Sequence, residues 1–371
     1  MNSKKKTGWL SVWIVILTAA WALGDQRPPW KGTIVKEGNV VVVKNPKTPQ
    51  YGDDTFSLEE DLAIGGQENS GFLLSEITSA CQSPDGTIFI LDGKEKDIKV
   101  FGPDGKFLRT FGKAGEGPGE FRLPRSIHYT NKNEVLVFDS IRRLSFFKPN
   151  GDHIRDVSAA VLDLMDAHPD SKGNYFAYLI VRDAANPRYE LRKLNGELKT
   201  EFVLDSSPLP NTIRDGFNPF FPILRWSTLP GDRAVSGYAV KYELKIYDSK
   251  GQIVRKIWMD SDQISISQKD IEERTADVPA SILKNMKIPK QFPYFRFLVT
   301  DDEDRIYVLT WKHSPDGKRF TYDIFDAEGR YIVRAALPRL IPIIRKGYLF
   351  GNEETEEGYP ILKRYKMRWL F

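Results

Sequence analysis

Residues 83–111 are the segment that decides the fold. They begin with SPDGTIFILD at 83–92 and continue with IKVFGPDGKFLRTF at 98–111. Each Asp-Gly pair is followed by a short run rich in strand-forming apolar residues. An Asp-Gly pair between two such runs is a strong signal for a β-hairpin. The segment therefore predicts short antiparallel strands joined by tight turns.

The same pattern recurs along the rest of the chain. A second copy has NKNEVLVFD at 131–139 and FFKPNGDHIRDV at 146–157. Further copies lie at 170–199, 229–254, 301–333 and, in partial form, 346–365. Each copy predicts an inner strand, two further strands, a glycine turn and an outer strand. Four antiparallel strands in a repeat of about 40–50 residues are typical of a β-propeller blade.

The sixth copy ends before its outer strand. A strand that could replace it lies near the N-terminus, at 33–35 (TIV) or 39–43 (NVVVV). A strand from one terminus that completes the last blade would close the ring and remove open sheet edges. We therefore predict an all-β, six-bladed propeller of four-stranded antiparallel blades over 25–371, forming a single domain closed by an N-terminal strand.

One segment departs from the repeat. Ser267 and Asp270 have the spacing of a helix capping box, and Ile271, Ile282 and Leu283 follow in a charged context. This pattern predicts a short helical insertion at about 266–287, between the fourth and fifth repeats. A helix that covers a loop is the favoured interpretation, and a lid over the propeller mouth is the alternative.

The N-terminal 24 residues have the pattern of a signal peptide. Lys4, Lys5 and Lys6 precede an uncharged, mostly apolar run at 8–24, and Ala22 and Gly24 are small residues before a cleavage position at Asp25. This order is typical of secretory signals. The alternative is an uncleaved anchor helix, for which the run is slightly short. We expect a periplasmic or secreted protein whose only membrane contact would be an uncleaved N-terminal segment.

The composition is that of an ordinary globular protein. The chain has 371 residues, of which 41% are hydrophobic and 28% charged, and its formal net charge is +4, or +1 without the three N-terminal lysines. This excludes a disordered chain. It also argues against nucleic-acid binding, which requires a concentrated basic face. Cys81 is the only cysteine, so the chain has no internal disulfide.

Residues 85–92 with 98–101 and 104–108 resemble an NHL repeat, and 112–121 with 123–124 resemble the linker between two such repeats. Over residues 30–371 the sequence is similar to exported bacterial six-bladed β-propeller proteins of the NHL/TolB-like type. The resemblance implies the fold. It implies little about function, because one fold supports many unrelated functions.

An arginine begins several of the predicted inner strands. When the copies are aligned on their first turn, Arg125, Arg296 and Arg339 share one position, and Arg225 lies one position away. Inner strands line the central channel of a propeller. Arginines at its mouth would bind carboxylate or phosphate groups through bidentate hydrogen bonds. The alternative is that each arginine is solvated or paired with an acidic residue of the next blade.

A second set of residues could hold a metal ion in the channel. Some propellers that resemble this fold do so: amidating lyases use histidines for zinc, and lactonase-like propellers hold calcium with oxygen ligands. Here only His128 and His168 lie near inner strands, and two histidines fall short of a three-ligand zinc site unless a carboxylate joins them. Glu76 and Asp166 could contribute to a calcium site of the lactonase-like kind. No spacing demands such a site, so surface or capping roles are favoured for these residues.

These observations favour a binding protein over an enzyme. No nucleophile–base pair is evident in the sequence. We expect the protein to bind a small anionic molecule or a protein partner at the channel mouth, near the insertion. The alternative is a metal-dependent lyase or hydrolase with its site in the central channel, using calcium or zinc.

Overall fold

The computed structural model describes residues 28–52, 55–66, 72, 74–140, 143–159, 162–210, 216–314 and 319–370. The predicted signal segment at 1–24 lies outside the described residues. Within the described ranges, none of the helices combines the length and apolar character needed to cross a membrane.

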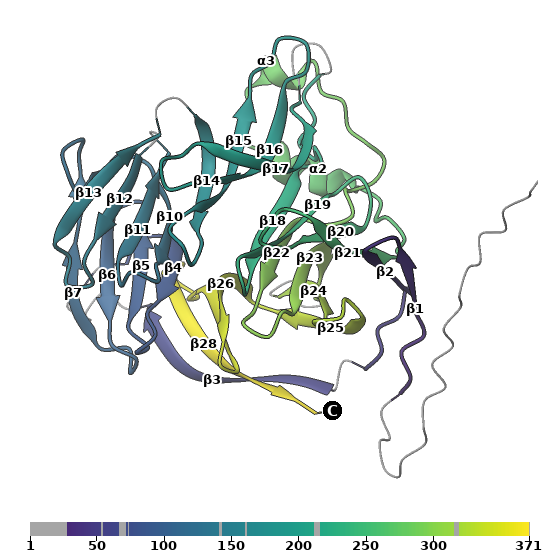
Figure 1. The fold of residues 1–371 in the computed structure, drawn as a ribbon, viewed down its shortest axis with the longest axis horizontal. Helices are drawn as coiled ribbons and strands as arrows, with labels where there is room; N and C mark the ends of the chain where they lie inside the picture. Colours follow the sequence, from purple (N-terminus) through teal and green to yellow (C-terminus); the bar gives the residue numbers. More distant parts are fainter. Residues whose placement is uncertain are drawn as a thin grey trace, which may run out of the picture.

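Six β-sheets are arranged around a ring (Figure 1). Blade 1 consists of β4 (Ile77–Gln82), β5 (Ile88–Asp92), β6 (Asp97–Phe101) and β7 (Phe107–Phe111). Blade 2 consists of β10 (Pro124–Tyr129), β11 (Val135–Asp139), β12 (Arg143–Phe147) and β13 (His153–Ser158). Blade 3 consists of β14 (Asp163–Pro169), β15 (Tyr175–Val181), β16 (Arg188–Leu194) and β17 (Thr200–Pro208). The linker between blades 1 and 2 holds β8 (Lys113–Ala114) and β9 (Glu120–Phe121).

Blade 4 consists of β18 (Leu224–Leu229), β19 (Arg233–Tyr238), β20 (Glu243–Tyr247) and β21 (Ile253–Met259). Blade 5 consists of β22 (Phe297–Thr300), β23 (Ile306–His313), β24 (Phe320–Phe325) and β25 (Tyr331–Leu337). Blade 6 consists of β26 (Arg339–Arg345), β27 (Tyr348–Glu354), β28 (Pro360–Trp369) and β3 (Phe56–Gly65). The predicted all-β, six-bladed propeller is confirmed. Four antiparallel strands return the chain to the face where the blade began. Every inner strand therefore starts at one face, the entry face, and ends at the opposite one, the exit face.

The ring is closed by an N-terminal strand, as predicted, but the strand is a different one. β3 pairs antiparallel with β28 in blade 6, and the two lie side by side in Figure 1. The segments at 33–35 and 39–43 belong instead to β1 (Thr33–Glu37) and β2 (Val40–Asn45). These two strands extend blade 4, where β2 runs parallel to β21.

Asn45 explains why β2 is held at blade 4. Its side-chain oxygen accepts hydrogen bonds from Trp30 Nε1 at 3.0 Å and from the backbone N–H of Tyr331 at 2.7 Å. Its side-chain nitrogen donates to the carbonyl of Gly329 at 2.9 Å. Tyr331 and Gly329 belong to blade 5, and the same nitrogen donates to the carbonyl of Trp258 in blade 4 at 3.3 Å. This buried amide therefore joins the N-terminal segment to two blades.

The hydrophobic core is distributed between the blades. Each buried cluster joins two neighbouring blades, as Ile90 of blade 1 and Phe350 of blade 6 illustrate. The described residues contain one such cluster at each of the six blade interfaces, including the interface between blades 6 and 1. Burial of these side chains therefore stabilises a closed ring rather than separate sheets.

The glycine turn before the outer strand has a packing role. Gly151 has φ of 102°, and a Cβ placed there would lie 2.8 Å from the Cβ of Phe111 in blade 1. Gly329 has φ of 83°, and a Cβ there would lie 2.7 Å from Ile257 in blade 4. These turns pack on the outer strand of the preceding blade, and a side chain would disturb both the turn and the blade contact.

The predicted helical insertion is present on the connection from blade 4 to blade 5. It contains α2 (Gln268–Thr275) and α3 (Ala280–Leu283). The capping box forms as expected, with reciprocal hydrogen bonds between Ser267 and Asp270. Neither helix has a buried residue. Because the insertion leads into β22, it lies at the entry face.

Candidate functional site

Three of the predicted arginines come from successive blades at the entry face. Arg225 is the second residue of β18, Arg296 directly precedes β22, and Arg339 is the first residue of β26. The antiparallel blade topology places the starts of these inner strands around the same mouth. The repeat therefore directs three guanidinium groups toward one region.

The positive charges of these arginines act on one another. Burial lowers the pKa of Arg296, and the charges of Arg274, Arg339 and Arg225 lower it further. Burial likewise lowers the pKa of Arg225, with an additional contribution from Arg274. Arg274 belongs to α2 of the insertion and is exposed. We call Arg225, Arg274, Arg296 and Arg339 the arginine cluster.

The arginine cluster has no counter-charge in the described part of the chain. None of its four guanidinium groups is in ion-pair contact with a described carboxylate. Arg274 has a weak hydrogen bond, 3.5 Å long, from Nε to the carbonyl of Pro219. Arg296 lies over the Trp311 ring, 4.9 Å from its centroid. Like charges held together without a carboxylate oppose folding, so an anion at this position would be favoured.

Aromatic rings surround the arginine cluster. Phe292 stacks on Trp311 at 4.2 Å between ring centroids, and the edge of Phe220 meets Phe292 at 5.1 Å. Tyr178 stacks on Tyr189 at 5.3 Å; burial raises the pKa of Tyr178, and the positive charge of Arg225 partly opposes this rise. The Oη of Tyr178 and the Nε1 of Trp311 are buried and have no hydrogen-bond partner in the ranges that the structure describes. The site thus combines cations and unused polar atoms with flat apolar surfaces.

Arg125 does not join the arginine cluster. It is the second residue of β10 in blade 2 and is exposed. It begins an inner strand at the same face, but it is not among the groups whose charges chiefly shift the pKa of Arg225 or Arg296. Sequence reasoning missed Arg274, because the repeat register gives no information about an insertion. The one available signal was the capping box that predicted its helix.

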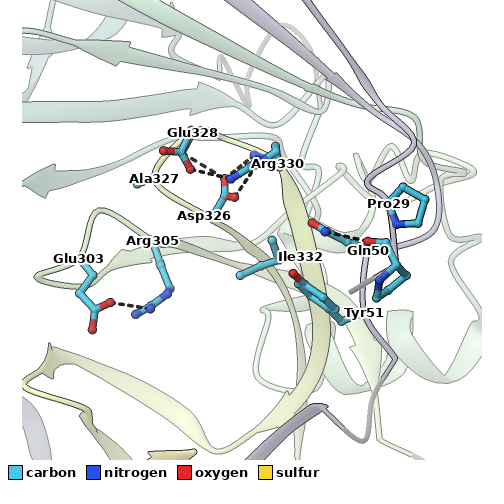
Figure 2. A pocket seen from close by; sticks show the side chains of 11 residues that line it. Pro29, Gln50, Tyr51, Glu303, Arg305, Asp326, Ala327, Glu328, Arg330 and Ile332 are labelled. Atoms are coloured by element: carbon cyan, nitrogen blue, oxygen red, sulfur yellow. Dashed lines mark hydrogen bonds and ion pairs between the residues drawn. The ribbon is translucent and has the colours of Figure 1, made fainter. Parts of the chain in front are cut away.

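A hollow at the outer side of blade 5 shows the opposite electrostatic arrangement (Figure 2). Its volume is about 600 Å³, and Pro29, Gln50 and the loops of blade 5 line it. Arg305 pairs with Glu303 at 2.6 Å, and Arg330 pairs with Asp326 at 2.7 Å. These arginines are neutralised by their own neighbours. The hollow therefore lacks the cationic surplus of the arginine cluster.

The channel opens at the exit face into a second cavity. Its volume is about 440 Å³, and residues from the inner strands of all six blades line it. His128 near the end of β10 and His168 near the end of β14 are among them. The sequence had named both as alternative metal ligands. The structure places them in adjacent blades on the same cavity.

His128, Asp166 and His168 form a compact group. The rings of His128 and His168 are 4.3 Å apart between centroids. His168 Nε2 lies 3.1 Å from Asp166 Oδ2, and one ligand atom from each of the three residues lies within 4.8 Å of the others. Glu76, the fourth residue that the sequence offered, is exposed and precedes β4 at the entry face. The structure does not bring it to this group.

The group is electrostatically asymmetric. Burial, reinforced by the positive charge of His168, lowers the pKa of His128 to about 3. Burial opposes ionisation of Asp166, yet the charge and the hydrogen bond of His168 hold the pKa of its carboxyl below the usual range. His128 is therefore a neutral imidazole and Asp166 a carboxylate at neutral pH. A neutral imidazole and a carboxylate are both forms that can bind a metal ion.

Closed blades, a central channel and polar groups at both of its ends define a six-bladed β-propeller with two candidate binding regions. The sequence of this chain places it in one family of such proteins. The profile of the DUF5128 family, described as a 6-bladed beta-propeller, matches residues 67–308, and the chain belongs to this family. No curated protein sequence matches the chain. The NHL/TolB-like character of the repeats stays a prediction.

Solved structures give the same fold at low sequence identity. A protein from Bacteroides fragilis that is predicted to be exported is 12% identical, with a TM-score of 0.58 over 88% of this chain and 99% of its own. A DUF4221 family member from Bacteroides vulgatus is 12% identical, with a TM-score of 0.50 over 85% and 99%. The calcium-binding protein regucalcin from Agrobacterium tumefaciens is 12% identical, with a TM-score of 0.42 over 80% and 93%. At these identities the first two similarities are of fold alone.

Proposed function

We propose that this propeller is a binding protein that captures a small molecule through a carboxylate or phosphate group at the entry face. The arginine cluster is the observation that carries the proposal. Arg225, Arg296 and Arg339 come from three blades, Arg274 comes from the insertion, and no described carboxylate neutralises them. Guanidinium groups bind such anions through paired, charge-assisted hydrogen bonds.

The aromatic surroundings indicate what the rest of the ligand contributes. Phe292 and Trp311 form a stacked pair beside Arg296, and Tyr178 and Tyr189 form another beside Arg225. Flat rings next to cations favour a ligand with an apolar or ring-shaped body attached to its anionic group. We take the insertion to cover this ligand, because Arg274 of α2 contributes its charge to the same region.

The place of action that we propose is outside the cytoplasm. The N-terminal segment has the order of a secretory signal, with Lys4, Lys5 and Lys6 before the apolar run at 8–24. A structurally similar protein from Bacteroides fragilis is predicted to be exported. A protein partner at the same mouth is the alternative ligand, and the small-molecule test below separates the two.

The proposal is tested by ligand-induced stabilisation of the purified full chain. Thermal unfolding is followed with phosphate, sulfate, acetate and citrate, at constant ionic strength. An anion present at about 100 times its dissociation constant stabilises the folded state by about 2.7 kcal/mol. We expect a shift of several degrees for at least one anion. Arg225→Gln and Arg296→Gln should abolish it.

Arg330→Gln is the matched control. It removes the same charge from a residue that is paired with Asp326 and Glu328 and lies away from the arginine cluster. Anion binding should survive this change. If no anion stabilises the protein, or if Arg330→Gln weakens binding as much as Arg296→Gln does, the small-anion proposal is wrong. A protein-binding propeller would then be the function to pursue.

A further inference from the structure

We propose that His128, His168 and Asp166 form a binding site for a borderline divalent metal ion such as Zn²⁺, at the exit face of the channel. This site is independent of the arginine cluster, which lies at the entry face. The donor set decides the class of metal. Two imidazoles and one carboxylate suit zinc, whereas calcium prefers an all-oxygen shell.

The spacing of the donor atoms fits a small ion. His168 Nε2 and Asp166 Oδ2 are 3.1 Å apart, and the whole group of three lies within 4.8 Å. Zinc binds nitrogen and oxygen ligands at about 2.0–2.2 Å, so ligand atoms around a tetrahedral ion are about 3.3–3.5 Å from one another. Asp166 and His168 therefore already have nearly this separation. His128 completes the set through a modest adjustment of its ring.

One buried nitrogen atom of the group supports a metal site. His128 Nε2 is buried, and it has no hydrogen-bond partner among the described residues. A buried polar atom without a partner costs about 1–3 kcal/mol. The ring of His128 packs against that of His168, and both residues line the cavity. A metal ion between the two imidazoles would satisfy this nitrogen.

Neighbouring groups hold the three donors in place. Ser126 Oγ donates a hydrogen bond to Asp166 Oδ1 at 2.8 Å, and the backbone N–H of Ala167 donates to the same atom at 2.9 Å. These bonds leave Oδ2 free to face His168. Trp226 packs against the His168 ring at 4.4 Å between centroids. Metal sites depend on this kind of outer support for ligand orientation.

The cavity gives the ion an entry path and an open position. Three protein ligands leave one position of a tetrahedral ion open for an oxygen atom of water or of a bound molecule. Catalytic zinc sites have this arrangement, whereas structural zinc sites use four protein ligands. The cavity of about 440 Å³ lies beside His128 and His168. The site is therefore suited to bind a water molecule or an oxygen-donor ligand on the metal.

The experiment measures metal binding directly. The full chain, purified without a polyhistidine tag and stripped with chelator, is titrated with Zn²⁺ by calorimetry and with Co²⁺ by visible absorption. We expect one ion per chain and the intense cobalt absorption of a tetrahedral site. His128→Gln and Asp166→Asn should weaken binding by more than about 100-fold. Ser126→Ala should weaken it by about 10- to 100-fold, as changes in supporting groups do.

His153→Gln is the matched control, because His153 also pairs with an aspartate, Asp156, at 3.0 Å. It has no second histidine beside it in the described chain, so its replacement should leave binding unchanged. Thermal unfolding in chelator shows whether each variant is folded. The proposal is overturned if the chain binds no stoichiometric ion, or if folded His128→Gln and Asp166→Asn bind as the unmodified chain does. Arg296→Gln should retain zinc, which separates this test from that of anion binding.

Discussion

Arginine side chains occupy two contrasting environments in this molecule. Arg305 and Arg330 on the outer side of blade 5 are each paired with two carboxylates. Arg225 and Arg296 at the entry face have lowered pKa values and lie among other cations. The first arrangement needs no ligand to balance its charge. The arrangement at the entry face opposes folding, because its charges repel one another. Such a loss of stability in favour of function is expected of a binding site.

This difference predicts that removing a charge from the arginine cluster stabilises the unliganded protein. Arg225→Gln should raise the free energy of unfolding by about 0.5–2 kcal/mol, the usual gain from relieving unfavourable charges. The gain should shrink in high salt because screening weakens repulsion. Urea unfolding at low and high salt measures the gain in the free energy of unfolding and its dependence on salt. Arg330→Gln, which loses paired carboxylates, should give no gain, and a loss of stability in Arg225→Gln at low salt would contradict the prediction.

The single cysteine should be unreactive in the folded protein. Cys81 on β4 is only 8% exposed, and burial raises the pKa of its thiol. The thiolate, which is the reactive form, is therefore scarce at neutral pH. A colourimetric thiol reagent should react negligibly with the native chain and with one equivalent in denaturant. Rapid reaction of the native protein would show that the end of β4 opens to solvent.

The glycine turns form a contact between blades, and their substitution should be costly. Gly151→Ala places a Cβ at φ of 102° against Phe111. Gly358 has a similar φ of 85° but nothing within 4 Å of an added Cβ, so Gly358→Ala isolates the backbone cost. We expect about 1 kcal/mol for Gly358→Ala and about 2–4 kcal/mol for Gly151→Ala, which adds overpacking. Denaturant unfolding of both variants tests this, and equal losses would exclude a contact role.

Elements with strong local signals could be predicted from the sequence, and elements with weak ones could not. The turn glycines and the apolar sequences of buried central strands such as β5 and β11 indicated the positions of the blades. The closing strand was assigned to the wrong segment because β3 (FSLEEDLAIG) is a mostly exposed outer strand whose centre is three acidic residues, Glu59, Glu60 and Asp61. The valine-rich β2 has a stronger strand pattern, yet it pairs with blade 4. Strand pairing between distant segments is not encoded in local propensity.

The candidate sites divide in the same way. The repeat register predicted three members of the arginine cluster, because equivalent positions in successive blades meet at one mouth. It could not predict Arg274, which belongs to the insertion, or show that Arg125 stands apart. His128 and Asp166 are separated by 37 intervening residues in the sequence. Their contact depends on how blades 2 and 3 are rotated against each other, which the sequence pattern does not specify.

At the scale of the whole molecule, the channel separates two different chemistries. The entry face carries cations that no described carboxylate pairs with, together with aromatic rings, and the exit face carries two histidines and a carboxylate. Each region draws residues from different blades, so each depends on the closed ring for its geometry. The stability of the closure therefore determines whether either region is assembled.

The two N-terminal hairpin strands and the closing strand should contribute differently to that stability. β3 pairs with β28 over nine residue pairs, and its Ile64 is only 2% exposed. β2 pairs with β21 over five residue pairs, at the edge of a blade that already has four strands.

A chain that starts at residue 55 should remain a folded monomer of reduced thermal stability, because it loses the Asn45 hydrogen bonds. A chain that starts at residue 67 should expose the edge of β28 and the apolar face of blade 6, and aggregate. Size-exclusion chromatography and thermal unfolding distinguish these outcomes. If the chain from 67 remains monomeric and unfolds like the chain from 55, the ring is held closed by its blade interfaces rather than by β3.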